Sequence, residues 1–219
     1  TDGSAGTALV TDGSGALSFS SVGADLYAVN PVSATDPTAA GDNGIAIGSN
    51  AVNTTTHGSK NGLAIGTNAV ADYWATALGA GTDATGNSSL AVGYNSQATG
   101  SKSTAIMNSY ASGESSFAAV IDNNTSSYGA TGANSITIGK LSKTTSASAL
   151  AIGQANTTSG LQALTLGYTN QATGGASAAI GYSNNATSTN GYAYAFGLLN
   201  TVSSSNGGGA FGATNAVTG

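Results

Sequence analysis

Ile45-Ala46-Ile47-Gly48 is the stretch that decides the fold, because variants of this tetrapeptide return through the rest of the chain. Leu90-Ala91-Val92-Gly93 is a clear copy, whereas Thr104-Ala105-Ile106-Met107 and Phe117-Ala118-Ala119-Val120 are degenerate ones. The twelve copies end at positions 48, 66, 79, 93, 107, 120, 139, 153, 167, 181, 197 and 212, and the intervals 48–66 and 120–139 are the longest. The typical period of about 14 residues is too short for the common helical and propeller repeats. It fits one coil of a β-solenoid with two short strands and two tight turns.

The residues within one copy predict which side of the strand faces the core. The alternation of large and small residues in Leu90-Ala91-Val92 has the period of two expected of a half-buried strand. Alanine then faces one side and the branched residues the other. We expect a thin coil whose interior is mostly alanine with one or two branched residues. The glycine that ends the copy predicts a sharp corner or a close backbone approach.

The second half of the coil is predicted to carry an alanine preceded by a polar residue. Asparagine at a corner suits left-handed backbone geometry, and amides stacked from coil to coil are expected to form hydrogen-bonded ladders. The pairs with this pattern are Asn50-Ala51, Asn68-Ala69, Gln97-Ala98, Gln171-Ala172, Asn185-Ala186 and Asn215-Ala216.

The composition excludes several classes of protein. Charged residues make up 6% of the chain, the only basic residues are four lysines, and the net charge is −5. Nucleic acid and anionic membranes are therefore not expected as partners, because phosphate neutralisation needs clustered basic residues. Cysteine is absent, so a disulfide or a thiolate-bound metal is excluded. No stretch reaches the roughly 20 apolar residues of a membrane helix, and membrane insertion by this segment is not expected.

A thin coil predicts self-association. Burying mostly alanine removes little apolar area from water at about 25 cal/mol per Å², whereas ordering the backbone costs ~1–2 kcal/mol per residue. A single chain would also leave one face of branched side chains in water. We therefore expect an obligate homotrimer with three chains around one axis.

Residues 44–219 resemble the head repeats of trimeric autotransporter adhesins, the YadA-like head. Ser88-Ser89-Leu90-Ala91-Val92-Gly93, Ser96-Gln97-Ala98-Thr99-Gly100 and Asn134-Ser135-Ile136-Thr137-Ile138-Gly139 carry this resemblance. It implies that each chain forms a left-handed parallel β-roll of about twelve coils. It also implies that three rolls pack into a trimeric head that binds host surface molecules.

Residues 1–43 differ from the repeats. Residues 1–29 contain Asp-Gly turns at regular spacing between short apolar runs, which predicts β-hairpins. Residues 30–43 hold the two prolines, Pro31 and Pro37, and are expected to form an irregular linker. Residues 1–19 resemble segments of bacteriophage tail-fibre proteins.

The predicted function is non-enzymatic attachment to a host or cell surface through a glycan or protein receptor. Because the first thirty residues lack a signal segment, the tail fibre of a virion is the favoured setting. The head of a bacterial trimeric autotransporter on the outer-membrane surface is the alternative, and both settings are extracellular. Two minor alternatives are a glycan-degrading tail spike and an ice-binding solenoid. The latter would need flat rows of threonine, and the threonines here are scattered across coil positions.

Receptor contacts are expected where loops break the period or where aromatic residues cluster, since binding residues concentrate on loops. The insertion 53–61 contributes His57 and Lys60, and the long interval 120–139 contributes Asp122, Asn123, Asn124 and Tyr128. Tyr73 with Trp74, and Tyr192 near Tyr194, are candidates for stacking on sugar rings. Structural alternatives remain open for all of these residues, because they can also cover coil ends or pack between subunits.

Other side chains favour structure over chemistry. Tyr94, Tyr168 and Tyr182 each follow a corner glycine, and we expect them to form a structural aromatic ladder. His57 is the only histidine and Glu114 the only glutamate, so neither a nucleophile with a base nor a paired-acid site is supported. Aspartate does not recur in register, as calcium-binding solenoid repeats would require. No cofactor and no metal are expected.

Overall fold

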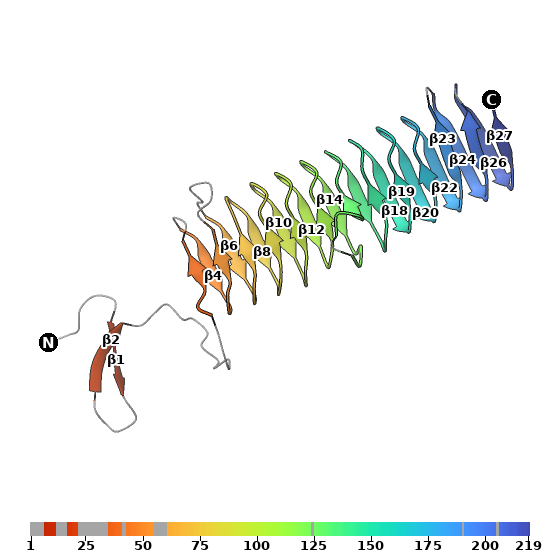
Figure 1. The fold of residues 1–219 in the computed structure, drawn as a ribbon. Helices are drawn as coiled ribbons and strands as arrows, with labels where there is room; N and C mark the ends of the chain where they lie inside the picture. Colours follow the sequence, from red (N-terminus) through yellow and green to blue (C-terminus); the bar gives the residue numbers. More distant parts are fainter. Residues whose placement is uncertain are drawn as a thin grey trace. The chain divides into compact units, whose positions relative to one another are not determined.

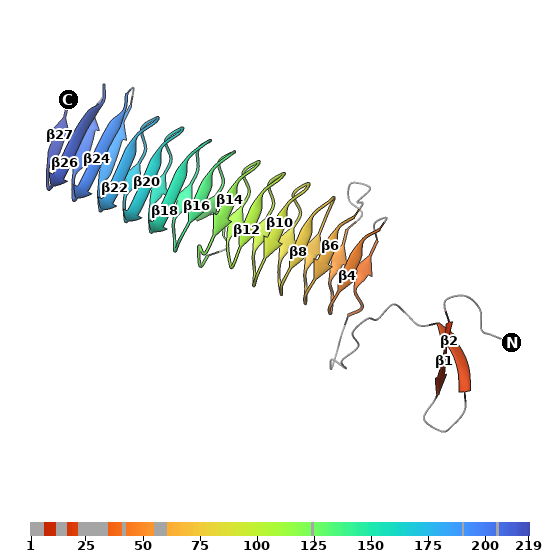
Figure 2. The same ribbon diagram turned by 180° about the vertical axis from the view of Figure 1, so that it is seen from behind.

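Two parallel β-sheets build residues 35–219 into a rod, with strands stacked from one end to the other (Figure 1, Figure 2). The computed structural model describes residues 7–11, 17–21, 35–40, 43–54, 61–123, 125–189, 191–204 and 206–219. Successive strands alternate between the two sheets, so each coil contributes one strand to each. The expected all-β parallel solenoid, with one coil for each sequence repeat, is confirmed, and no helix occurs among the described residues.

One sheet, here the even sheet, has 12 strands. Its members in chain order are β4 (Ile45–Ile47), β6 (Leu63–Ile65), β8 (Thr76–Leu78), β10 (Leu90–Val92), β12 (Thr104–Ile106), β14 (Phe117–Ala119), β16 (Ile136–Ile138), β18 (Leu150–Gln154), β20 (Leu164–Tyr168), β22 (Ala178–Tyr182), β24 (Ala193–Leu198) and β26 (Gly208–Ala213). Neighbouring copies of the repeat pair in register, so that Ala91 lies between Ala77 and Ala105.

The other sheet, the odd sheet, has 13 shorter strands. They are β3 (Thr38–Ala39), β5 (Val52–Asn53), β7 (Val70–Ala71), β9 (Asp83–Ala84), β11 (Gln97–Ala98), β13 (Tyr110–Ala111), β15 (Gly129–Ala130), β17 (Lys143–Thr144), β19 (Thr157–Thr158), β21 (Gln171–Ala172), β23 (Asn185–Ser188), β25 (Thr201–Ser204) and β27 (Ala216–Thr218).

The N-terminal unit, residues 1–34, contains one described element pair. β1 (Thr7–Thr11) and β2 (Leu17–Ser21) pair antiparallel, with Leu9 opposite Phe19. The pair lies within the segment for which the sequence predicts hairpins. The Asp-Gly dipeptides themselves and half of the predicted linker, residues 30–34 and 41–42, lie outside the described residues, and Thr38–Ala39 within the linker range form β3.

The interior between the sheets is made of small side chains. The middle residue of most even strands and the second residue of most odd strands point inward, and Ala77, Ala91, Ala98 and Ala111 are fully buried. Their branched neighbours on the even strands, such as Leu90, are only half-buried on the outer face. The expected alanine interior is confirmed. Ile121, in the long interval 120–139, is among the largest fully buried side chains.

The corner glycines combine an unusual backbone conformation with a close approach between coils. Gly167 has φ +117°, and a Cβ atom at that position would collide with the carbonyl oxygen of Gly181 in the next coil. Both observations confirm the predicted role of the glycine. Met107 and Val120 end the two degenerate copies with φ values of 55° and 56°, and a β-branched residue such as Val120 is rare there.

The polar-alanine pairs occupy three coil positions, so treating them as one position was wrong. Asn50 and Asn68 lie at corners with φ values of 54° and 56°, and Asn50 Nδ2 donates to Asn68 Oδ1 at 2.8 Å, as expected. Gln97, Gln171 and Asn185 instead begin odd strands, where extended backbone turns their side chains outward. Asn215 is the exposed last rung of an amide ladder, as expected, but the sequence reasoning did not identify the buried rungs before it.

This buried asparagine ladder is formed by side chains at the third position after successive corner glycines. From Asn170 onward, each Nδ2 donates to Oδ1 of the preceding rung at 3.1 to 3.2 Å. In Asn170, Asn184 and Asn200 it also donates to one backbone carbonyl of its own coil and one of the next coil. The backbone N–H of each of these four residues also donates to that same Oδ1 atom, whereas the N–H of Asn156 donates to Ser142 Oγ. The buried rungs are Asn156, Asn170, Asn184 and Asn200, and the exposed Asn215 is the last rung.

Candidate functional site

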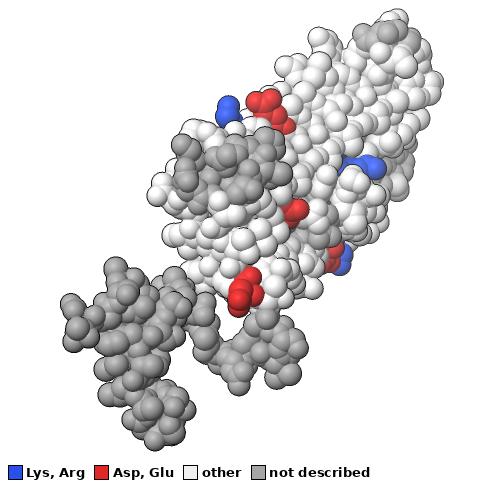
Figure 3. Space-filling view, turned by 60° about the vertical axis from the view of Figure 1, so that its left-hand side comes forward, with Lys and Arg blue, Asp and Glu red and all other residues white. Residues whose placement is uncertain are grey.

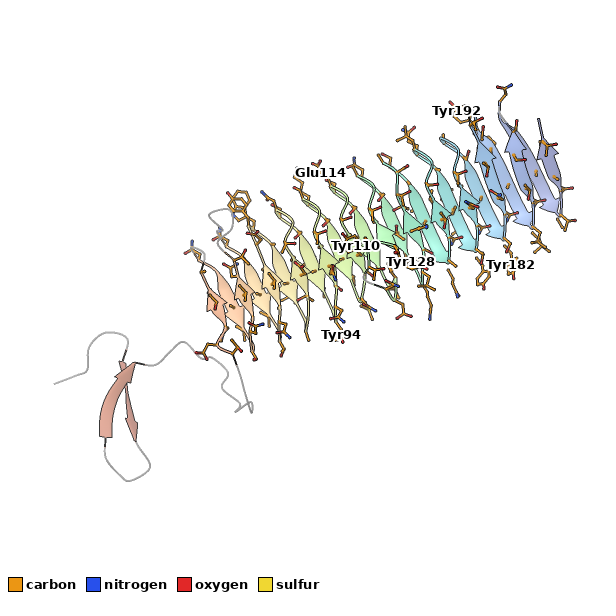
Figure 4. All side chains as sticks on the ribbon, viewed as in Figure 1. Tyr94, Tyr110, Glu114, Tyr128, Tyr182 and Tyr192 are labelled. Atoms are coloured by element: carbon orange, nitrogen blue, oxygen red, sulfur yellow. The ribbon has the colours of Figure 1, made fainter. Side chains whose placement is uncertain are left out.

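Each coil turns at two edges of the rod. The glycine edge joins an even strand to the following odd strand, as at Gly93–Ser96, and the return edge joins an odd strand to the following even strand, as at Gly86–Ser89. In Figure 4, Tyr94 and Tyr182 lie along one edge and Glu114 and Tyr192 along the other. Charged side chains are sparse on the face in Figure 3. Recognition of a partner would therefore depend on aromatic, hydroxyl and amide groups.

The return edge of one coil carries an aromatic pair. Tyr73 and Trp74 lie with ring centroids 4.5 Å apart and their planes tilted by 39°. Trp74 occupies the turn position with φ +53°, which Ser88 and Lys102 fill in the next two coils. Trp74 is 52% exposed, so its surface is available to a partner. The sequence-based grouping of Tyr73 with Trp74 therefore corresponds to a real contact.

A groove of about 540 Å³ lies beside this pair. It spans three successive coils and combines a phenol ring with carboxylate, hydroxyl and amide groups. Tyr73 N donates to Asp72 Oδ1 at 2.8 Å, and Asn87 Oδ1 accepts a hydrogen bond from Ser88 Oγ at 2.8 Å. The lining residues are Asp72, Tyr73, Thr85, Gly86, Asn87, Thr99 and Ser101.

Three of these groove residues belong to a row that runs along the outer face of the odd sheet. Each member follows the inward residue of an odd strand, and the row is tied from coil to coil by the backbone, as where Thr99 N donates to the Ala111 carbonyl. Thr187, Ser203 and Thr218 are paired directly in register. The hydroxyl row comprises Thr54, Thr85, Thr99, Ser112, Thr131, Thr145, Ser159, Thr173, Thr187, Ser203 and Thr218, with Asp72 in the second place.

The sequence-based expectation that the threonines are scattered across coil positions was wrong for the members of the hydroxyl row. The residues share one coil position, but coils of unequal length shift them in the linear sequence. From Thr131 to Thr187 the members are evenly spaced, and this signal could have revealed the row. The neighbouring outward position is not regular, because it holds Asp83, Gln97, Tyr110 and Gly129 in successive coils. The odd sheet therefore has a single flat row.

The candidates in the interval 120–139 fall into two environments. Asp122 is exposed and forms an ion pair of 3.0 Å with Lys140, and Asn123 Oδ1 accepts hydrogen bonds from the backbone and hydroxyl of Thr125. Tyr128 packs against the alanine core, which favours its structural reading. Asn124 lies outside the described residues.

A second groove, of about 440 Å³, lies at the glycine edge and includes Asp122. Its other lining side chains are mostly apolar, with Tyr94, Met107 and Val120 all more than half exposed. The apolar character arises because Met107 and Val120 replace the usual corner glycine.

The remaining aromatic candidates lie farther along the rod. Tyr192 is exposed and lines a third groove of about 400 Å³. Tyr194 contacts Phe196, with ring centroids 6.3 Å apart. Tyr168 and Tyr182 stack at 5.1 Å with planes 15° apart, which confirms the expected ladder for these two rings. Tyr94 takes part in no ring pair among the described residues.

Neither the remaining predicted receptor contacts nor the titratable groups among the described residues form a reactive or metal-binding site. His57 and Lys60 lie outside the described residues. Burial raises the pKa of Asp83, a hydrogen bond with Thr85 opposes this shift, and Asp83 Oδ1 is buried without a partner among the described groups. In the described part of the chain, no three His, Cys, Asp or Glu residues lie close enough to hold a metal ion. No helix in that part is long and apolar enough to cross a membrane.

Comparison with known families supports the resemblance seen in the repeats. The sequence model of the YadA head domain repeat matches the chain in two copies, at residues 38–51 and 84–106. The first match covers β3 and β4, and the second covers β10 to β12 with the turns around them. The second match also contains Thr85, Asn87, Thr99 and Ser101 of the first groove. A search of curated proteins found no match.

Proposed function

We propose that residues 35–219 form one arm of a homotrimeric surface fibre that attaches to a host or cell surface without enzymatic activity. The observation that carries this proposal is the contrast between the outer faces of the two sheets. Even strands present branched and aromatic residues outward, including Ile45, Ile136, Leu166 and Phe211, each at least 41% exposed. The corresponding odd-strand positions are mostly polar, such as Gln97, Lys143, Gln171 and Thr201.

An apolar face of this length favours assembly over a monomeric state. Soluble monomers rarely expose contiguous apolar patches larger than a few hundred Å², and here the patch recurs in nearly every coil. Packing even sheets around a common axis would bury it and leave the odd sheets and the first groove outside. The trimeric number follows the resemblance to YadA-like heads, which the two matched segments support.

The rod geometry suits a surface adhesin. Twelve coils at about 4.8 Å per step give a length of roughly 55 Å, and most of its backbone is hydrogen-bonded between coils. YadA head repeats are parts of surface-exposed adhesins, so an extracellular setting follows from the same match. Our more specific proposal is that the rod belongs to the tail fibre of a virion, and it rests on the resemblance of residues 1–19 to tail-fibre proteins.

Oligomeric state and adhesion together test the proposed function. Light scattering of the purified chain should give three times the chain mass at micromolar concentration. Ile152→Glu on the outer face of the even sheet should reduce that mass, whereas Thr157→Glu on the odd sheet should not. Beads coated with the chain should bind at least one panel of bacterial or animal cells. A monomeric mass for the unmodified chain would refute the trimer, and beads that bind no cells would refute attachment.

A further inference from the structure

We infer that the groove beside Tyr73 and Trp74 binds a neutral, linear oligosaccharide that lies along the rod axis. This inference rests on the proposed attachment function and names the chemical class of its receptor. The site combines one exposed aromatic surface with a short, regular series of hydroxyl and amide groups. Ligand sites of this kind use an aromatic wall for contact area and a few polar groups for orientation.

The aromatic part of the site is a pair of touching rings. Trp74 is the only tryptophan of the chain and is 52% exposed, and Tyr73 supports it from the groove side. A large rigid ring offers contact area at low conformational entropy cost, which is why Trp and Tyr are enriched among binding hot spots. The ring faces of the pair can cover the apolar face of a sugar ring.

The polar part of the site can pair with sugar hydroxyls. Among the described residues, Asn87 Nδ2 and the hydroxyl groups of Thr99 and Ser101 have no protein hydrogen-bond partner. They are therefore free to donate to or accept from a ligand without breaking an existing bond. The described lining residues of the groove include no lysine or arginine, so no basic group among them favours an anionic ligand.

The direction of the ligand follows from the stacking of the coils. The groove takes residues from three successive coils, which places Asp72, Thr85 and Thr99 at steps of about 4.8 Å along one line. This line is about 10 Å long, and the hydroxyl row continues it toward Thr218. A linear chain with its own short repeat can therefore use equivalent contacts on successive coils, which a compact monosaccharide cannot.

The single tryptophan provides a direct measurement. The full chain is titrated with hexasaccharides of β-1,4-linked glucose, β-1,4-linked N-acetylglucosamine and α-1,4-linked glucose while Trp74 fluorescence is followed. Binding of at least one hexasaccharide should change the emission and reduce quenching by acrylamide. Calorimetry should show at least tenfold weaker binding for Trp74→Ala, a two- to tenfold loss for Thr99→Val, and no change for Tyr182→Ala, an exposed ring of the structural ladder on the opposite edge. Unchanged circular dichroism and oligomeric mass confirm that each variant is folded.

Two results would overturn the inference. One is no saccharide binding in any titration, and the other is binding that Trp74→Ala leaves intact. Bead adhesion separates this failure from a failure of the proposed function. Beads that adhere equally well with Trp74→Ala and in excess hexasaccharide, together with either of these two results, would retain attachment and refute the saccharide site. Beads that adhere to no cells, combined with Trp74-dependent binding in solution, would refute attachment and retain the site.

Discussion

Replacing Asn184 by alanine should destabilise the C-terminal half of the rod more than any surface substitution nearby. The side chain is 1% exposed and lies in the middle of the buried asparagine ladder. Its Nδ2 donates to Asn170 Oδ1, the Ile180 carbonyl and the Gly197 carbonyl at 3.1, 3.0 and 2.7 Å. Its Oδ1 accepts from both the backbone N–H and Nδ2 of Asn200.

The expected cost follows from the groups that alanine would leave without partners. The backbone N–H of Asn200 would lose its acceptor inside the protein, which costs about 1–3 kcal/mol. Asn170 Oδ1 and Asn200 Nδ2 keep other hydrogen bonds, and each loss among these two groups and the Ile180 and Gly197 carbonyls costs about 0.5–1.5 kcal/mol. These terms sum to about 3–9 kcal/mol, and because losses within one network are not additive we expect about 3–5 kcal/mol, at the upper end of single-residue effects.

The matched control is Asn185→Ala, at the next position of the chain. Asn185 faces outward from β23 and accepts a hydrogen bond from Thr187 Oγ1 at 2.6 Å, so its loss should cost at most about 1 kcal/mol. Guanidinium unfolding followed by circular dichroism measures both variants, and hydrogen exchange reports on the amide of Asn200. Equal stabilities for the two variants, or an unchanged exchange rate at Asn200, would refute the assigned role of the ladder.

Three further predictions concern the corners, a buried acid and the core. Gly167→Ala should lower stability by about 2–4 kcal/mol, because φ is +117° and the Cβ would meet the Gly181 carbonyl, whereas Gly175→Ala has open space and should be nearly neutral in thermal unfolding. Burial raises the pKa of Asp83 in the folded protein, so ionisation of its carboxyl group lowers folding stability increasingly as pH rises above the unfolded pKa of about 3.9. Asp83→Asn should therefore raise Tm at pH 7 and lose this advantage at pH 3. An equal increase in Tm at pH 7 and pH 3 would show that ionisation of Asp83 is not the cause. Ile121→Ala should cost about 2–5 kcal/mol in guanidinium unfolding, because the fully buried side chain leaves a cavity, and a cost below about 1 kcal/mol would show that the coil collapses around it.

The repeat predicted the main architecture because its residues act locally. Alternation in Leu90-Ala91-Val92 determines which side chain faces inward, and Gly93 provides the corner, without knowledge of any other coil. These are properties of single residues and their nearest neighbours, and they recur often enough to be recognised.

Features built between coils were less predictable. The position of Asn184 in the ladder holds Ala69, Thr82 and Ser96 in earlier coils, so no constant residue type marks it. The first groove draws Asp72, Thr85 and Thr99 from three coils, and none of them is unusual alone. Tyr73 and Trp74 were found because aromatic residues are rare in this chain, whereas their polar neighbours are common.

The direction of the hydrogen bonds has a mechanical consequence. Hydrogen bonds between coils run along the rod axis, so a force that pulls on the ends of the rod acts on every pair of neighbouring coils. The pair with the weakest bonding separates first. From Asn156 onward, asparagine side chains add bonds that cross from one coil to the next. The side chains of Thr82 and Ser96, at the same position in earlier coils, bond only within their own coil. Under tension the rod should therefore open first at the coils of Thr82 and Ser96, and the part from Asn156 onward should extend less under the same force.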